Sequence, residues 1–397
     1  MSSTPDVFIV GAARTPIGKF LGAYATLKAS DLGAVAIREA MKRAGVAGDQ
    51  VDEVIMGHVV QGGQGQATAR QALIKAGISP MVGAFAVNKV CGSGLKAVML
   101  AAQAIKAGDA DCIVAGGQES MSTAPHYLFS GRLGQRLGDT TLKDGVVHDG
   151  LWCSFNDCHM IELAQYTAEK AKLTRGRIDE FSVASQKKAA AAQGAGAFDA
   201  EMANVTIPQR KGDPIVVSKD ESVRGDTTLE GLAKLGPVTR DKAGIITAGN
   251  APGLNDGGAA LVLMSAARVK ATGAKPLARV TGYATGGGEP KDLFFAPIDA
   301  VQKLMKKLGV GIGHFDLIEA NEAFAAQAVA DGDALGWDWD RVNVNGGAVA
   351  LGHPIGASGA RVLTTLLYAM QARNKQTGMA TLCLGGGNAV ALSVERV

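Results

Sequence analysis

The stretch Val90-Cys91-Gly92-Ser93-Gly94 opens an amphipathic helix, and Ile355-Gly356-Ala357-Ser358-Gly359 opens a second one in the same way. Each helix is followed by a short apolar strand, Cys112–Ala115 in the first case and Ala380–Leu384 in the second, and glycines come directly after both strands. One strand–turn–helix–strand unit therefore occurs twice. Such a duplication predicts an α/β fold of two similar sheets, packed back to back with helices between them and outside them.

Short β-branched apolar runs alternate with helical periodicity along most of the chain, which is the pattern of parallel strands joined by crossover helices. Helices are predicted after Ser30 as N-cap and up to Gly45, after Ser93 and up to Gly108, and from Ala300 to Leu308. The predicted strands are Asp6–Val10, Glu53–Gly57, Asp111–Ala115, Ala259–Met264, Leu277–Tyr283, Asp316–Glu319, Val342–Val344, Ala380–Leu384 and Ala389–Val394.

The pattern changes between about residues 120 and 250. Glycines and scattered charges break up the periodicity of 121–149, residues 160–195 read as helical, and 212–240 reads as loop. We interpret this segment as an insertion into a regular core. The predicted domains are therefore an N-terminal half of residues 1–120 plus 250–272, an inserted loop domain of residues 121–249, and a C-terminal half of residues 273–397.

Composition excludes several classes of protein. The chain has 397 residues, 47% of them hydrophobic, and 40 Lys and Arg against 37 Asp and Glu. This apolar fraction excludes a disordered chain, and the near-neutral charge gives no reason to expect a nucleic-acid partner. No apolar run approaches the ~18–20 residues that cross a bilayer. The N-terminus lacks the basic region of a signal peptide, and Glu395-Arg396-Val397 is not a peroxisomal signal. We expect a soluble, cytoplasmic protein with no membrane contact.

The five cysteines form neither a disulfide framework nor a zinc site, because their number is odd and no C-x-x-C pair is present. We expect no bound metal. Cys112 lies inside a predicted apolar strand, and we interpret it as a core residue. We interpret Cys153 and Cys158 as incidental thiols of the insertion.

Cys91 has a different setting, between an apolar segment and a helix that begins near Ser93. A helix N-terminus presents unpaired N–H groups and the positive end of the helix dipole, which favour a thiolate. Gly92 and Gly94 leave room for a substrate. A cysteine at a strand–helix turn can equally be a small buried core residue, but the flanking glycines and the helix start favour a reactive thiol.

Three further positions are candidates for chemistry. His353 lies on a glycine-rich turn before Pro354 and is either a general base or a turn histidine bonded to the backbone. Asn321 follows a predicted strand and starts a helix, where active sites of α/β sheets gather. Cys383 ends its strand just before Gly385, whose free N–H is a candidate oxyanion-hole donor. The alternative for Cys383 is ordinary strand core.

Taken together, these segments resemble the thiolase family, which comprises acetyl-CoA acetyltransferases and 3-ketoacyl-CoA thiolases. The resemblance spans essentially the whole chain. It rests on Ala13–Gly18, Val90–Gly94, Gly116–Met121, Asn255–Gly257, Asn321–Phe324, Gly352–Pro354 and Cys383–Gly387. It implies a duplicated five-layered αβαβα core with a loop domain inserted in the first half, and a homotetramer built as a dimer of dimers.

The resemblance also implies roles for the candidate residues. Cys91 would take the acyl group from acyl-CoA, and His353 would accept the proton of its thiol. Cys383 would act as base on the α-carbon of acetyl-CoA, or as acid in the reverse reaction. Asn321 would hold a water that, with a histidine N–H, forms one oxyanion hole, and the N–H groups of Cys91 and Gly385 would form the other.

Acyl-CoA thioesters are then the substrates, and no separate cofactor is expected. The resemblance places coenzyme A along Leu151, His159, Met160, Arg224, Ala248, Ala323 and Phe324. The chain departs from the family pattern at Pro252, where a serine is usual, at Ile161, where glycine is common, and at Gly231, where a serine is frequent. Leu293-Phe294 occupies the place where a Phe-Pro pair accepts a 2-methyl branch, so activity on branched substrates is in question.

The sequence therefore predicts an acyltransferase that condenses two acetyl-CoA to acetoacetyl-CoA and CoA, reversibly, through an acyl-Cys91 intermediate. The alternative within the family is a 3-ketoacyl-CoA thiolase of broader chain length. An NAD-dependent oxidoreductase is disfavoured, because the segment from Gly11 to Gly18 does not have the G-x-G-x-x-G pattern. A lipid-binding or scaffold protein that kept only the fold would lack Cys91, His353 or Cys383, and all three are present.

Overall fold

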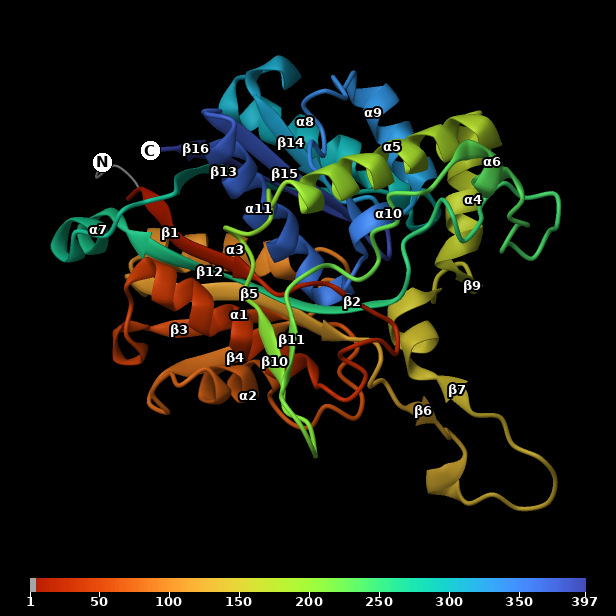
Figure 1. The fold of residues 1–397 in the computed structure, drawn as a ribbon, viewed down its shortest axis with the longest axis horizontal. Coiled ribbons are helices and arrows are strands. Elements are labelled where there is room, and N and C mark those ends of the chain that lie inside the picture. The colour runs from red at the N-terminus through yellow and green to blue at the C-terminus, as the bar shows by residue number, and fades with distance from the viewer. Residues whose placement is uncertain (1–4) are drawn as a thin grey trace.

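The computed structural model describes residues 5–397 and contains a ten-stranded mixed sheet (Figure 1). Its strands are β1 (Val7–Arg14), β2 (Gly18–Lys19), β3 (Glu53–Gly57), β4 (Gly83–Val87), β5 (Cys112–Ser120), β12 (Asn255–Ser265), β13 (Ala278–Gly287), β14 (Leu317–Ala320), β15 (Thr377–Leu384) and β16 (Asn388–Arg396). The strand order is β14-β15-β16-β13-β1-β12-β5-β3-β4, with β2 beside β12.

The helices connect and cover these strands. They are α1 (Ala29–Ala44), α2 (Thr68–Lys75), α3 (Ser93–Ala107), α4 (Met160–Lys170), α5 (Arg175–Gly194), α6 (Leu229–Ala233), α7 (Ala266–Thr272), α8 (Ala296–Leu308), α9 (Ala325–Leu335), α10 (Ala348–Leu351) and α11 (Ile355–Ala372). Shorter helical turns are η1 (Gly48–Gln50), η2 (Gly131–Leu133), η3 (Val146–Leu151), η4 (Pro290–Phe295) and η5 (Ile312–His314). No helix among the described residues is long and apolar enough to cross a membrane.

The strands of the two predicted halves are joined into one ladder. Residues Phe8 and Ile9 of β1 pair with Arg279 and Ala278 of β13, which connects the N-terminal strands to the C-terminal ones. The prediction of parallel strands is also wrong for part of the sheet, because β1, β12, β13 and β16 run antiparallel to their neighbours. The reason is local for β15 and β16: a turn at Gly385–Gly387 folds them into a hairpin, with Gly386 and Gly387 at φ of 81° and 83°.

The elements are stacked in layers. Helices α3 and α11 pack on each other and contact strands of both halves, α1 and α2 cover the outer face of the N-terminal strands, and α8 covers β13 and β16. In Figure 1, α3 and α11 lie between the N-terminal half below and the C-terminal half above. The large hydrophobic core fills the space around α3 and α11 and extends through the C-terminal strands to α8.

Most predicted elements are present, but several are longer than predicted: β1 ends at Arg14 rather than Val10, β5 at Ser120 rather than Ala115, and α8 begins at Ala296 rather than Ala300. Three further differences concern a cap and two strands. Helix α1 begins at Ala29, and its N-cap is Lys28, whose N–H donates to the Asp31 carboxylate at 3.0 Å, so the predicted cap at Ser30 is wrong. Residues 342–344 form only an isolated bridge to Ile318. The edge strand β4 was not predicted, because its sequence is short and partly exposed.

Two glycines of the duplicated motif allow α3 and α11 to touch at their N-termini. A Cβ added to Gly359 would lie 2.2 Å from the backbone N of Leu95, and one added to Gly94 would lie 2.7 Å from the N of Ala360. Neither position has room for a side chain. The close crossing brings the turn that carries Cys91 next to the turn that carries His353.

We therefore expect Gly359→Ala to destabilise the protein by about 1–3 kcal/mol, because the new methyl group must push two helix backbones apart. The expected result is a lower midpoint of urea unfolding. Gly176→Ala in α5 is the matched control, since an added Cβ there meets nothing within 4 Å. Equal midpoints for Gly359→Ala and wild type would contradict the close contact.

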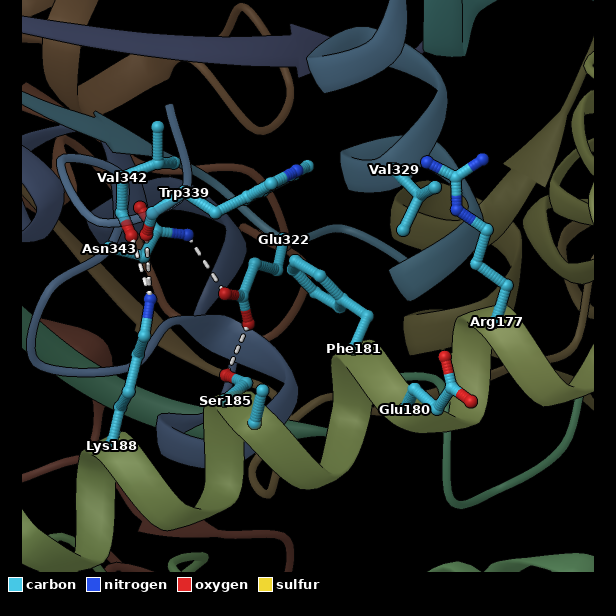
Figure 2. A pocket seen from close by; sticks show the side chains of 11 residues that line it. Arg177, Glu180, Phe181, Ser185, Lys188, Glu322, Val329, Trp339, Val342 and Asn343 are labelled. Carbon is cyan, nitrogen blue, oxygen red and sulfur yellow. Dashed lines mark hydrogen bonds between the residues drawn. The ribbon is translucent and has the colours of Figure 1, made fainter. Parts of the chain in front are cut away.

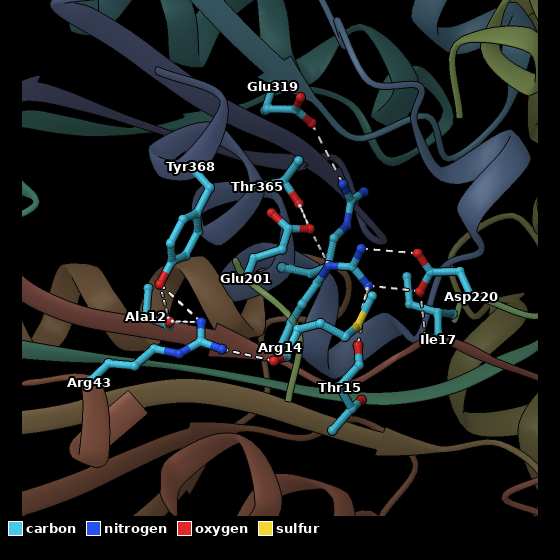
Figure 3. A network of polar contacts seen from close by, with 12 residues as sticks. Ala12, Arg14, Thr15, Ile17, Arg43, Glu201, Asp220, Glu319, Thr365 and Tyr368 are labelled. Atoms are coloured by element: carbon cyan, nitrogen blue, oxygen red, sulfur yellow. Dashed lines mark hydrogen bonds and ion pairs between the residues drawn. The ribbon is translucent and has the colours of Figure 1, made fainter. Parts of the chain in front are cut away.

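The segment of the predicted insertion is anchored to β1 by a buried ion network (Figure 3). The Arg14 guanidinium binds the Glu201 carboxylate at 2.5 Å and the Asp220 carboxylate at 2.7 Å, and all three side chains are buried. Asp220 also accepts from the N–H of Ile17 at 2.7 Å. Because both carboxylates of the segment bind the same cation, loss of Arg14 would leave two buried acidic groups without it.

The rest of the segment consists of three small hairpins and helices α4–α6. The hairpins are β6 (His126–Tyr127) with β7 (Lys143–Asp144), β8 (Trp152–Cys153) with β9 (Cys158–His159), and β10 (Val205–Ile207) with β11 (Ile215–Val217). Cys153 and Cys158, which read as incidental thiols in the sequence, face each other across β8 and β9, and both are free. The exact domain boundaries stay a prediction.

Candidate active site

A cavity of about 330 Å³ lies where the N-terminal turns of α3 and α11 meet the insertion and the turn after β15. Among the predicted residues, those that line it are Cys91, His353, Cys383, Gly385, Leu151, His159, Met160, Ala323 and Phe324. Its wall is mainly apolar. The sequence motifs that lie far apart along the chain therefore meet around one space.

The turn that presents Cys91 is fixed by its neighbours. Val90 has a φ of 46°, an unusual left-handed conformation for a β-branched residue. The Ser93 hydroxyl accepts from the N–H of Lys89 at 2.8 Å and donates to the carbonyl of Val90 at 2.6 Å. Strained backbone of this kind persists only where its surroundings hold it, and it gathers at functional sites.

The protonation state of Cys91 differs from the sequence-based expectation. Burial raises the pKa of the Cys91 thiol to about 12, and the nearby N–H of Gly385 lowers it only in part. Loss of hydration on burial therefore opposes the thiolate that the helix N-terminus is expected to favour. Attack by Cys91 then calls for a base that takes the thiol proton.

His353 has a defined tautomer and a free nitrogen. Its Nδ1 lies 2.6 Å from Ser358 Oγ, and the Ser358 hydroxyl donates to the carbonyl of Pro354 at 3.0 Å. With the single proton of that hydroxyl directed to Pro354, His353 Nδ1–H donates to Oγ. Nε2 is then unprotonated, and it is buried without a hydrogen-bond partner among residues 5–397. His353 thus presents a lone pair that can accept a proton.

The electrostatic surroundings keep His353 neutral. Burial, together with the cation of Arg361, lowers the pKa of His353 to about 3. With a Cys91 thiol of pKa about 12 in the same cavity, the resting pair is neutral thiol and neutral imidazole. These opposite shifts favour a proton transfer from sulfur to nitrogen that is coupled to attack of the thiol on a substrate.

Cys383 and Gly385 also line the cavity, on the same strand end and turn. Cys383 is fully buried at the end of β15, and burial raises the pKa of its thiol well above the ordinary value, with a further contribution from Cys91. Gly385 follows on the turn and directs its N–H toward Cys91. The cavity therefore holds two protonated thiols and a bare backbone donor close to one of them.

Asn321 is not among the residues that line the cavity. Its backbone N–H donates to the carbonyl of Thr381 at 3.0 Å, which places it just after β14. Both polar atoms of its side chain are buried without a partner among the described residues. An amide in this state can bind a water molecule, because buried polar groups otherwise lose their hydrogen bonds.

The predicted coenzyme contacts divide into two groups. Leu151, His159, Met160, Ala323 and Phe324 line the cavity, and His159 also caps α4 by accepting from the N–H of Ile161 at 3.1 Å. Arg224 and Ala248 are exposed and are not among the lining residues. Pro252, Ile161 and the pair Leu293-Phe294 do line the cavity. The departures from the family pattern at these positions therefore change the wall itself.

Residues 7–267 match the family described as thiolase, N-terminal domain, and residues 274–396 match thiolase, C-terminal domain. The chain is 54% identical to the acetyl-CoA acetyltransferase of Cupriavidus necator, over 98% of this chain and 99% of the relative. It is 53% identical to that of Escherichia coli, over 98% of both chains. The crystal structure of the Bacillus anthracis acetyl-CoA acetyltransferase matches with a TM-score of 0.97 and 41% identity, covering 100% of both chains.

The chain belongs to the thiolase family. Both the family resemblance seen in the sequence and the predicted thiolase-like α/β fold are confirmed. In this thiolase no group of three or more His, Cys, Asp or Glu side chains within residues 5–397 could hold a metal ion.

Sequence reasoning missed several residues that build this thiolase site. Asn255 accepts from the N–H of His353 at 2.9 Å and donates to the carbonyl of Gly18 at 3.0 Å, so it ties the histidine turn to β2. Glu119 accepts from the N–H of Gly356 at 2.9 Å, at the start of α11. Both lie in motifs that carried the family resemblance, but only the folded chain shows what they contact.

Ser358 is the missed residue with the most direct effect on chemistry. We expect Ser358→Ala to lower kcat on the order of 10- to 100-fold, because His353 loses the acceptor that fixes its ring and tautomer. The measurement is the steady-state rate of acetoacetyl-CoA thiolysis. Thr364→Ala, one buried hydroxyl further along α11 and without a partner in the structure, is the control. Equal rates for Ser358→Ala and wild type would show that the tautomer is held by another group.

Proposed function

We propose that this chain is an acetyl-CoA acetyltransferase that condenses two acetyl-CoA, reversibly, to acetoacetyl-CoA and CoA through an acetyl-Cys91 intermediate. One observation supports this most directly. A single apolar cavity presents two thiols, Cys91 and Cys383, the unprotonated Nε2 of His353 and the N–H of Gly385. The identity to acetyl-CoA acetyltransferases from several bacteria supports the same reaction.

In the first half-reaction Cys91 sulfur attacks the thioester carbonyl of acetyl-CoA while its proton moves to His353 Nε2. The N–H groups of Cys91 and Gly385 stabilise the oxyanion, and each such donor contributes on the order of 3 kcal/mol. The bond from carbon to the CoA sulfur then breaks. The departing CoA thiolate takes the proton of Cys383, which leaves acetyl-Cys91, a Cys383 thiolate and a protonated His353.

In the second half-reaction the Cys383 thiolate removes a proton from the α-carbon of a second acetyl-CoA. His353 Nε2–H and a water held by Asn321 stabilise the enolate oxygen. The α-carbon attacks acetyl-Cys91, the new carbon–carbon bond forms and the carbon–sulfur bond to Cys91 breaks. The Cys91 thiolate recovers its proton from His353, so all three groups return to their starting states.

Coenzyme A is proposed to run from this wall along Leu151, His159, Met160, Ala323 and Phe324 toward the exposed Arg224 and Ala248. An apolar path suits the pantetheine chain, and a surface arginine suits phosphate groups. Pro252 cannot supply the hydroxyl that a serine would offer. We therefore expect the affinity for coenzyme A to depend more on contacts with the apolar wall than on a hydrogen bond at this position.

The acyl end of the cavity favours a small group. Phe294 and Phe324 pack edge to face with ring centroids 5.3 Å apart, and Leu293 and Phe294 are almost fully buried. We infer that these side chains leave little room for a longer or 2-methyl-branched acyl chain. The test is the rate of thiolysis across 3-ketoacyl-CoA lengths and with the 2-methyl substrate. We expect acetoacetyl-CoA to react fastest, whereas rates that rise with chain length would favour the broader 3-ketoacyl-CoA thiolase.

We further propose a homotetramer in the cytoplasm. The β6–β7 hairpin extends from the body of the protein (Figure 1), and its tip carries Leu133 and Leu137 at 91% and 101% exposure. Apolar side chains on a projecting arm are typical of subunit contacts. Light scattering should give about four times the chain mass of 40.6 kDa. Leu133→Asp with Leu137→Asp should reduce this mass, and a wild-type monomer would contradict the proposal.

A further inference from the structure

Glu322, the residue after Asn321, carries a carboxylate that contacts three different parts of the fold (Figure 2). Glu322 is buried and accepts from the Ser185 hydroxyl of α5 at 2.8 Å, from Asn343 Nδ2 at 2.8 Å and from the N–H of Val349 in α10 at 3.0 Å. Both carboxylate oxygens are therefore occupied by donors. Glu322 is not among the residues that line the reactive cavity.

Asn343 continues this network on the other side of Asn321. Its Nδ2 donates to the carbonyl of Ala320 at 2.8 Å, and its Oδ1 accepts from the N–H of Ala320 at 2.9 Å. Asn343 has a φ of 46°, a left-handed conformation that asparagine tolerates better than most residues. Asn321 is thus held between two residues, Ala320 and Glu322, that both bind the same amide.

The far end of the network leads to His353. Val349 lies in α10, four residues before His353, and the N–H of Gly347 donates to the same Ser185 hydroxyl at 3.1 Å. A Cβ on Gly347 would lie 2.2 Å from the Glu322 carboxylate carbon, so the two segments are in direct contact. Lys188 of α5 also donates to the carbonyls of Trp339 and Val342, at 3.0 and 3.2 Å (Figure 2).

We propose that Glu322 is a positioning residue that fixes the Asn321 loop relative to the segment carrying His353, with Asn343 and Ser185 as its partners. This proposal rests on the proposed function, since it concerns the two groups that stabilise the enolate. A carboxylate suits the role because it can accept three donors at once and has none of its own. Any neutral replacement leaves at least one buried donor poorly matched.

The test compares Glu322→Gln with wild type in acetoacetyl-CoA thiolysis. Active sites are first counted by the amplitude of Cys91 acetylation with radiolabelled acetyl-CoA, so that kcat is expressed for each competent site. We expect this kcat to fall on the order of 10- to 100-fold while KM changes less than about threefold, because a small displacement of a catalytic group slows chemistry without weakening binding. Glu180→Gln, an exposed carboxylate on the same wall of α5, is the control and should match wild type.

A purely structural role has a different signature. It would lower the number of competent sites or the melting temperature and leave kcat for each site unchanged, and that result would overturn the proposal. If Glu322→Gln does not yield folded protein, Ser185→Ala removes one of the three bonds, and an unchanged kcat for each site there would overturn it equally. An inactive wild type would instead refute the proposed function, so the two failures are distinguishable.

Discussion

Replacing Cys91 by alanine should abolish both thiolysis and condensation, with turnover falling on the order of 10⁴-fold or more. The reason is that no other group in the cavity can form the covalent intermediate. Cys383 is the other thiol that lines the cavity, but it is fully buried at the end of β15, so we do not expect it to reach the thioester carbon in place of Cys91. The measurement is the rate of acetoacetyl-CoA cleavage with a large excess of variant enzyme.

Chemical labelling tests the same residue in the wild-type enzyme. Iodoacetamide should inactivate the protein and label the tryptic peptide Val90–Lys96, whose only cysteine is Cys91, because His353 Nε2 can take the thiol proton as the sulfur is alkylated. Acetyl-CoA should protect this peptide, because an acetylated thiol cannot be alkylated. Cys112→Ala is the control: Cys112 is core in β5, so its loss should cost stability and leave the chemistry intact. Full activity of Cys91→Ala would refute the mechanism.

The places of the candidate residues in the fold could be predicted because each depends on a local pattern. Glycines flank Cys91, precede His353 and follow Cys383, and in each case the structure places the residue on a turn at the end of a strand or the start of a helix. The duplicated glycine pattern at the two helix starts has a physical reason. Gly94 and Gly359 are needed in both copies, since the two helices meet at these positions.

The features that could not be predicted from the sequence depend on contacts between distant segments. The pKa of Cys91 could not be derived from its position at a helix start, because its burial comes from the insertion and from the turn after β15. Glu322 is one residue from a predicted site residue, yet its partners come from α5, Asn343 and α10. The pairing of β1 with β13 through Phe8 and Ile9 could not be predicted either, because no local sequence pattern indicates which distant strands pair.

Replacing Cys383 by serine should separate the two half-reactions. A serine hydroxyl is a far weaker acid than a thiol, so it supplies no anion that could remove an α-proton from acetyl-CoA. We expect condensation and thiolysis to fall on the order of 10³-fold or more. The rate of Cys91 acetylation should stay within about tenfold of the wild-type rate. The nucleophile Cys91 and the base His353 are unchanged, and the departing CoA thiolate is stable without a proton from the enzyme.

Rapid mixing with radiolabelled acetyl-CoA measures the first half-reaction as protein-bound label, and acetoacetyl-CoA formation measures the second. Cys158→Ser is the matched control, since it makes the same chemical change at a half-buried thiol of β9, and both half-reactions should stay within about threefold of wild type. Unimpaired condensation by Cys383→Ser would refute the role of Cys383 as carbon base. Loss of acetylation together with condensation would mean that Cys383 is required already when Cys91 attacks. The raised pKa of Cys383 argues against that outcome, because a thiol that stays protonated at rest cannot activate Cys91, whereas the free Nε2 of His353 can.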